Sequence, residues 1–218
     1  MAHRVGLYGG SFNPIHVGHL IVARSVAEQL ALERVEFLCS AAPPHKRQVD
    51  LITAEHRAAM VRLAIEGEPR FAANDIDLVR PGPTYTIETV RRWRSAHPDA
   101  EPVWIIGGDS LAELPTWRDA GQLVDECRIV TATRPLDRDI DWTPIEQSLG
   151  RQRADRLREG MLATPVIDVS ATDIRRRVAG GRSIRYLVPN SVADYIERHG
   201  LYQSFPDAGT PTGRVGNC

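Results

Sequence analysis

The chain alternates between short apolar runs and longer segments in which apolar residues recur at helical spacing. A run such as Val35 to Cys39 predicts a buried strand, and the repeat of Leu20, Ala23, Ala27 and Leu30 predicts a helix with one apolar face. The same criteria predict strands at 5–8, 35–39, 71–78, 102–106, 128–133 and 165–169, and helices at about 20–30, 53–66, 84–96, 171–179 and 190–199. We interpret residues 137–160 as a loop with a surface helix.

This alternation predicts an α/β fold with a Rossmann-like, doubly wound, mostly parallel sheet and helices on both faces. We expect one domain over residues 1–203, with a small helical C-terminal part at about 170–203. Residues 204–218 are rich in Gly, Pro and Thr, and we expect a disordered tail. Ligands of such sheets bind beyond the carboxyl ends of the strands, so functional residues are expected in the loops that follow strands.

Composition limits the partners. The 218 residues are 42% hydrophobic, which is enough for a sizeable core. Lys and Arg number 27 against 28 Asp and Glu, so the net charge of -1 gives no sign of nucleic acid or membrane binding. Cys39 and Cys127 lie in or beside apolar runs, and Cys218 is remote from both, so we expect core cysteines in a reducing cytoplasm. The sequence is compatible with a homo-oligomer but does not give the oligomeric state.

The most informative segment runs from Gly9 to Leu20 and reads Gly-Gly-Ser-Phe-Asn-Pro-Ile-His-Val-Gly-His-Leu. A strand, a Gly-rich turn and a helix start together form a site where backbone N–H groups can hold phosphate. His16 and His19 are three residues apart, so they project from one face of the helix start, and Gly18 keeps bulk away from them. The glycine pair taken alone is also compatible with a simple tight turn.

A second phosphate candidate is the segment Ser170 to Arg175, which reads Ser-Ala-Thr-Asp-Ile-Arg. A helix cap explains Ser170 and Asp173 without any ligand. It does not explain Thr172 and Arg175, whose hydroxyl and guanidinium would both face an anion at the helix N-terminus.

Further candidates lie in other loops that follow strands. Lys46 lies in a loop stiffened by proline, and Arg134 follows the strand at 128–133. Asp109 suits hydrogen bonding to a ribose, and Trp117 suits stacking on a planar base. The N–H groups near Tyr85 and Thr86 could receive a carboxylate. The structural alternatives are a surface lysine for Lys46, a helix N-cap for Asp109, a core residue for Trp117, and capping of the helix at 84–96 by Thr84 or Thr86.

Two phosphate sites without a strong nucleophile, metal cluster or carboxylate pair favour phosphoryl or nucleotidyl transfer by positioning. The protein then aligns the nucleophile with the leaving group and neutralises developing charge. The sequence shows no serine–histidine–acid arrangement, so covalent catalysis has little support.

The two motifs resemble the signatures of the nucleotidyltransferase superfamily related to class I aminoacyl-tRNA synthetases. The segments between and after them are similar to the bacterial nicotinate-mononucleotide adenylyltransferases, and the resemblance covers residues 4–202. It is carried by Pro43–Lys46, Pro83–Thr86, Ile106–Ser110, Trp117, Tyr186–Pro189 and Gly200–Tyr202.

The resemblance implies transfer of AMP from ATP to nicotinate mononucleotide, giving nicotinate adenine dinucleotide and pyrophosphate. The acceptor's 5′-phosphate is an anionic nucleophile already, so no general base is implied. Mg²⁺ would travel with the ATP phosphates. By resemblance, His16, His19 and Arg175 are catalytic; Gly9, Gly10, Ser11, Phe12, Gly107, Ser170, Thr172 and Arg175 bind ATP; and Lys46, Tyr85, Thr86, Asp109, Trp117 and Arg134 bind the acceptor.

Three positions depart from the commonest pattern of the family. Ser11 and Asn13 replace Thr and Asp, and Ala171 replaces Ser. Both histidines, Thr172 and Arg175 are kept, which argues against an inactive relative. Transfer to nicotinamide mononucleotide or phosphopantetheine remains an alternative, and so does a nucleotide sensor or a tRNA-binding protein without catalysis.

Overall fold

The computed structural model describes residues 3–42, 51–79, 82–133 and 140–204. It contains a six-stranded sheet in the order β3-β2-β1-β4-β5-β6, and each neighbouring pair is parallel. This confirms the predicted fold class. The strands are β1 (His3–Gly10), β2 (Arg34–Cys39), β3 (Phe71–Asn74), β4 (Ala100–Gly107), β5 (Arg128–Thr133) and β6 (Met161–Ala163).

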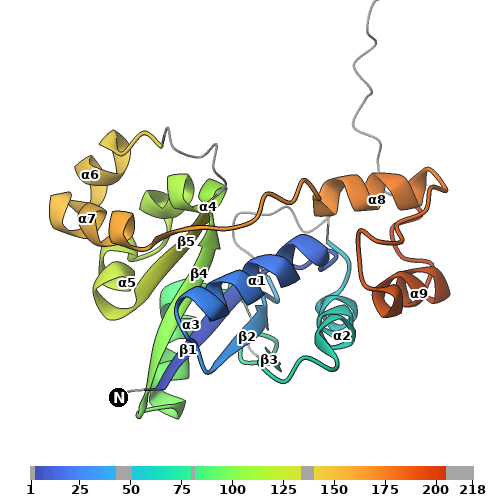
Figure 1. Cartoon of the computed structure of the whole chain (residues 1–218), viewed down its shortest axis with the longest axis horizontal. Coiled ribbons are helices and arrows are strands. Elements are labelled where there is room, and N and C mark those ends of the chain that lie inside the picture. The colour runs from blue at the N-terminus through green and yellow to red at the C-terminus, as the bar shows by residue number, and fades with distance from the viewer. Residues whose placement is uncertain (1–2, 43–50, 80–81, 134–139, 205–218) are drawn as a thin grey trace, which may run out of the picture.

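Helices cover both faces of the sheet, and each face has its own apolar core (Figure 1). Phe37 packs into one core and its neighbour Leu38 into the other, because successive side chains of a strand point to opposite faces. The first core holds α1 (Val17–Gln29), α2 (Ala54–Ile65), α8 (Ala171–Ala179) and α9 (Asn190–Arg198). The second holds α3 (Thr86–Ala96), α4 (Gly108–Glu113), the 3-10 helix η2 (Leu114–Thr116), α5 (Ala120–Glu126), α6 (Thr143–Leu149) and α7 (Arg151–Glu159).

The helical C-terminal part packs against the beginning of the chain. The Tyr202 hydroxyl donates to Asn13 Oδ1 at 2.9 Å, and the N–H of Val17 donates to the carbonyl of Leu187 at 3.0 Å. In Figure 1, α8 and α9 lie together beyond α2, joined to the sheet by a long extended segment. The turn after β1 is therefore held from both ends of the sequence.

Two predicted strands are wrong in extent or place. The predicted strand at 165–169 is extended but unpaired, and β6 lies just before it. The N–H of Thr164 still donates to Thr133, but Pro165 has no N–H to continue the ladder. The strand predicted at 71–78 ends at Asn74, whose side-chain oxygen accepts from the N–H of Ile76 and begins a turn.

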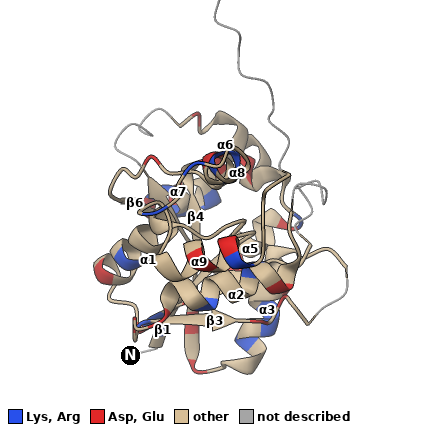
Figure 2. Ribbon diagram, turned by 90° about the vertical axis from the view of Figure 1, so that its right-hand side faces the viewer, with Lys and Arg blue, Asp and Glu red and all other residues tan. Residues whose placement is uncertain are grey.

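The Arg-rich segment 151–158 lies in α7, which buries Ala154 and Leu157 in the second core and carries its arginines on the outer face. Arg153 and Arg156 both pair with Asp125 of α5, and Arg158 pairs with Asp155. Basic and acidic residues are interspersed along the helices in Figure 2.

The two cysteines that fall within the described ranges, Cys39 and Cys127, are buried, as predicted. Cys218 and the expected tail lie outside the described residues. Across the described ranges, the helices are too short or too polar to span a bilayer.

Candidate active site

Two adjoining cavities open at the carboxyl ends of β1 and β4, where the strand order reverses. The first cavity, of about 340 Å³, reaches from the turn after β1 to the start of α3. The second, of about 350 Å³, reaches from His16 to the start of α8. Both are of a size typical of small-molecule sites. The residues that line both cavities are Tyr8, His19, Gly107 and Ala171, so the cavities meet beside His19.

The turn after β1 has the tight backbone that the sequence predicts. The turn follows Gly9 and Gly10, the last residues of β1, and a Cβ atom on Gly9 would lie 2.4 Å from the Trp104 ring, so only glycine fits there. Phe12 has a left-handed φ of 44°, and its ring is buried in the first core. The turn residues Gly9 to Phe12, assigned to ATP by resemblance, line the first cavity but not the second.

His16 and His19 lie ring against ring, with centroids 3.7 Å apart. The backbone N–H of His16 donates to Nδ1 of His19 at 3.2 Å. Since Nδ1 accepts, the ring hydrogen of neutral His19 is on Nε2, which makes Nε2 its donor nitrogen. The backbone of the helix start thus fixes the tautomer of the histidine that borders both cavities.

His16 is buried at the N-cap of α1, with 8% of its surface exposed. Burial lowers the pKa of His16 from 6.5 to about 4. The ring is therefore neutral at pH 7. His16 thus brings no imidazolium charge to the site, and its buried Nδ1 has no hydrogen-bond partner among the described residues.

Arg57 on α2 supports the turn from behind, and sequence reasoning missed it. Its side chain is 1% exposed, and no ion pair among the described residues includes it. The guanidinium instead donates to four backbone carbonyls, those of Ser11 at 2.7 Å, Ser40 at 2.7 Å, Ala41 at 3.1 Å and Ile52 at 3.1 Å. The sequence pattern that could have revealed Arg57 is the position of an arginine on the apolar face of an amphipathic helix.

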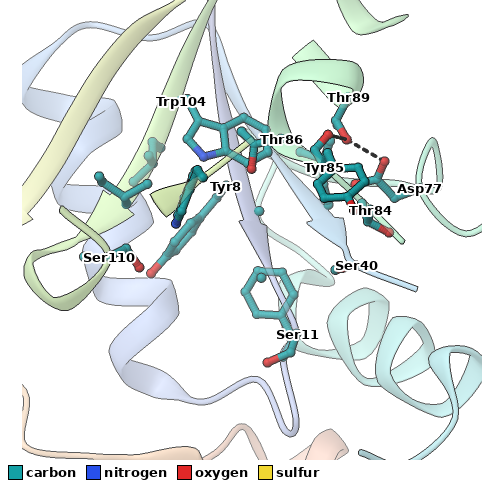
Figure 3. A pocket seen from close by; sticks show the side chains of 18 of the residues that line it. Tyr8, Ser11, Ser40, Asp77, Thr84, Tyr85, Thr86, Thr89, Trp104 and Ser110 are labelled. Atoms are coloured by element: carbon teal, nitrogen blue, oxygen red, sulfur yellow. Dashed lines mark hydrogen bonds between the residues drawn. The ribbon is translucent and has the colours of Figure 1, made fainter. Parts of the chain in front are cut away.

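The far wall of the first cavity is polar. The hydroxyl of Thr89 donates to buried Asp77 at 2.7 Å and lies 3.3 Å from the carbonyl of Tyr85 (Figure 3). Tyr85 is the N-cap of α3 and makes no side-chain capping hydrogen bond. Neither Thr84 nor Thr86 is the N-cap of α3, so the structural alternative of a threonine cap does not hold. Tyr85 and Thr86 both line this cavity.

Trp117 also lines the first cavity and packs partly against the second core. Its indole Nε1 is buried and has no hydrogen-bond partner in the described part of the chain. Both the stacking and the core interpretation of Trp117 thus have a physical basis here.

The second cavity contains Asp109 and Ser170. Asp109 lies within the first turn of α4 rather than at its N-cap, which is Gly107. The Ser170 hydroxyl accepts from the N–H of Asp173 at 3.1 Å, which confirms the predicted cap. The unpaired segment after β6 completes the wall with Thr164, Pro165, Ile167 and Val169, residues that the sequence had assigned to a strand or not singled out.

Thr172 and Arg175 lie at the edge of the site, and neither lines the two cavities. Arg175 donates to the Asn13 carbonyl at 2.8 Å and to the Thr172 hydroxyl at 3.2 Å. It therefore ties α8 to the turn after β1. Lys46 and Arg134 lie outside the described residues.

Comparison with known proteins identifies the family. Residues 7–177 match the Cytidylyltransferase-like family. A protein of Thermomicrobium roseum named "Probable nicotinate-nucleotide adenylyltransferase" is 44% identical over 201 residues, covering 92% of each chain. One of the same name from Symbiobacterium thermophilum is 46% identical over 199 residues, covering 91% of this chain and 95% of the relative. The chain belongs to the nicotinate-nucleotide adenylyltransferase family.

A solved structure of another protein shares the fold of this chain. The nicotinic acid mononucleotide adenylyltransferase of Plasmodium falciparum, complexed with NaAD, superposes with a TM-score of 0.74. The match covers 92% of this chain and 97% of that chain at 18% sequence identity. At that identity the likeness establishes the shared fold.

We expect Arg57→Met to lower the free energy of unfolding by about 2–4 kcal/mol, because it leaves buried carbonyls without donors. The matched control is Arg62→Met on the same helix, where the exposed side chain pairs with Asp75. The control should stay within about 0.5 kcal/mol of the parent in urea unfolding. If the two variants had equal urea midpoints and equal slopes of free energy against urea concentration, the Arg57 contacts would contribute nothing to stability.

The lowered pKa of His16 predicts a pH-dependent stability. Between pH 6.5 and about 4 the unfolded chain binds a proton at His16 that the folded chain does not. Stability therefore falls as pH falls through this window, by about 2 kcal/mol for this residue between pH 8 and pH 5. Urea unfolding at both pH values should show a smaller loss for His16→Asn than for the parent. An equal loss in both proteins contradicts this origin.

Proposed function

We propose that this chain transfers AMP from ATP to nicotinate mononucleotide, forming nicotinate adenine dinucleotide and pyrophosphate in NAD biosynthesis. The observation that carries the proposal is the meeting of two nucleotide-sized cavities beside His19. A reaction that joins two mononucleotides needs two such sites with their phosphates in contact. The names of the relatives from Thermomicrobium and Symbiobacterium agree with this reaction.

We assign the acceptor to the first cavity. The first-turn N–H groups of α3, near Tyr85 and Thr86, would receive the nicotinate carboxylate, and Trp117 would stack on the pyridine ring. The assigned Lys46 and Arg134 would add positive charge toward the acceptor. The resemblance assigns Gly9 to Phe12 to ATP, but these residues line the first cavity and not the second, so we assign them instead to the 5′-phosphate of the acceptor, close to His19.

We assign ATP to the second cavity. Asp109 would bond the ribose, and the segment from Thr164 to Val169 would border the adenine. Gly107 lines both cavities and allows close approach, since nothing lies within 4 Å of its Cβ position. The start of α8, with Ser170, Thr172 and Arg175, would bind the leaving pyrophosphate through its N–H groups and the guanidinium.

The chemistry follows from positioning. An oxygen of the acceptor phosphate attacks the α-phosphorus of ATP in line, the new P–O bond forms, and the bond to pyrophosphate breaks. His19 donates from Nε2 to an α-phosphoryl oxygen as charge develops, and neutral His16 supports it. No proton has to be removed from the nucleophile.

Reactions of this kind on ATP generally use a divalent metal ion, and we propose Mg²⁺ bound to the ATP phosphates. Such an ion prefers oxygen ligands, and Asp109 is the single carboxylate among the described residues of the second cavity. The donor set thus fits an ion held mainly by phosphate. When bound, the ion neutralises charge on the transferring and leaving phosphates.

The test is pyrophosphate release from ATP with nicotinate mononucleotide, nicotinamide mononucleotide or phosphopantetheine as acceptor. We expect the nicotinate form to give the highest kcat/KM and the dinucleotide as product. A preference for another acceptor would support the corresponding alternative, and no release with any acceptor would support a nucleotide sensor.

His19→Ala should lower kcat by about 10²–10³ because a transition-state donor is lost. The variant is assayed with both substrates saturating, and its fold is checked by circular dichroism. Near-parental kcat in a folded His19→Ala protein would show that His19 does not stabilise the transition state.

A further inference from the structure

Charged side chains are scarce around the first cavity. Among the described residues that line it, Arg118 is the single Lys or Arg and Asp77 the single carboxylate. The carboxylate of Asp77 accepts a hydrogen bond from Thr89. An acceptor nucleotide that carries both a phosphate and a carboxylate brings negative charge into this space. In the described part of the cavity wall, Arg118 is then the permanent positive charge that can interact with this ligand.

The position of Arg118 is set by the start of α3. Its guanidinium carbon lies 4.6 Å from the centroid of the Tyr85 ring, a distance at which cation and ring attract each other. Nη1 of Arg118 lies 3.7 Å from Glu88, which is also in the first turns of α3. The guanidinium is thus placed at the same end of the cavity as the N–H groups near Tyr85 and Thr86.

The side chain keeps donors for a ligand. Its distances to Glu88 and to Asp119, 3.7 Å and 3.9 Å, are those of loose ion pairs rather than hydrogen bonds. Within the described residues, no hydrogen bond uses an N–H of Arg118. The side chain is 54% exposed, so a ligand can reach it without disturbing the core. A guanidinium presents five donors in a planar fork that matches a carboxylate.

We propose that Arg118 is a specificity-determining residue that binds the carboxylate of the acceptor and so favours nicotinate over nicotinamide mononucleotide. The inference rests on the proposed function and names one source of its selectivity. The two acceptors share the ribose, the 5′-phosphate and the pyridinium ring. They differ in a carboxylate against a neutral amide, so a cation at that group acts on the difference between them.

The test compares kcat/KM for both acceptors in the parent, Arg118→Met, Arg118→Lys and a control, Arg91→Met. Arg91 is an exposed arginine of α3 that pairs with Glu126 and does not line the cavity. We expect Arg118→Met to lower kcat/KM about tenfold for nicotinate mononucleotide and less than about twofold for the amide. Arg118→Lys keeps the charge without the fork and should give an intermediate ratio. Arg91→Met should leave both values unchanged.

Salt provides an independent readout. The preference of the parent for the carboxylate should weaken between 50 and 500 mM NaCl, roughly as an exposed ion pair is screened, and that of Arg118→Met should not. An acceptor ratio equal to the parent's in Arg118→Met, or an equal loss for both acceptors, overturns the proposal. If the parent forms no dinucleotide from either acceptor, the proposed function itself fails, which is a separate result.

Discussion

The buried guanidinium of Arg57 is the contact on which the geometry of the site depends. It joins the turn after β1 to the end of β2 and to the segment just before α2 through four backbone carbonyls and the Cys39 sulfur. A phosphate site made of backbone N–H groups works only if that backbone is held still. The same turn is fixed on its other side by Arg175 of α8 and by Tyr202 after α9, which both reach Asn13.

This frame also sets the position of the two histidines. His19 is oriented by the backbone N–H of His16, and His16 is kept uncharged by burial. Neither ring needs to titrate for the reaction that we propose, because the nucleophile is already an anion. A hydrogen-bond donor at the junction of two cavities suits a transfer in which alignment, rather than proton movement, lowers the barrier.

Local patterns in the sequence predicted much of this molecule. The strand at Arg128–Thr133 agrees to the residue, and the Ser170 cap formed as its spacing indicated. The wall of the second cavity was harder to predict from the sequence. Pro165 to Val169 has the apolar pattern of a strand, but in the fold it has no neighbouring strand to pair with. Arg57, Trp104 and Arg118 owe their importance to contacts with residues far away in sequence, which no local pattern contains. The roles assigned to individual site residues stay predictions.

The most direct test of the account is a crystal structure of the chain with nicotinate adenine dinucleotide. We predict the pyridine ring in the first cavity, beside Trp117 and the start of α3, and the adenine in the second, beside the segment after β6. The bridging phosphates should lie within hydrogen-bond distance of His19 Nε2. A dinucleotide with its two rings exchanged, or bound away from His19, would contradict the account.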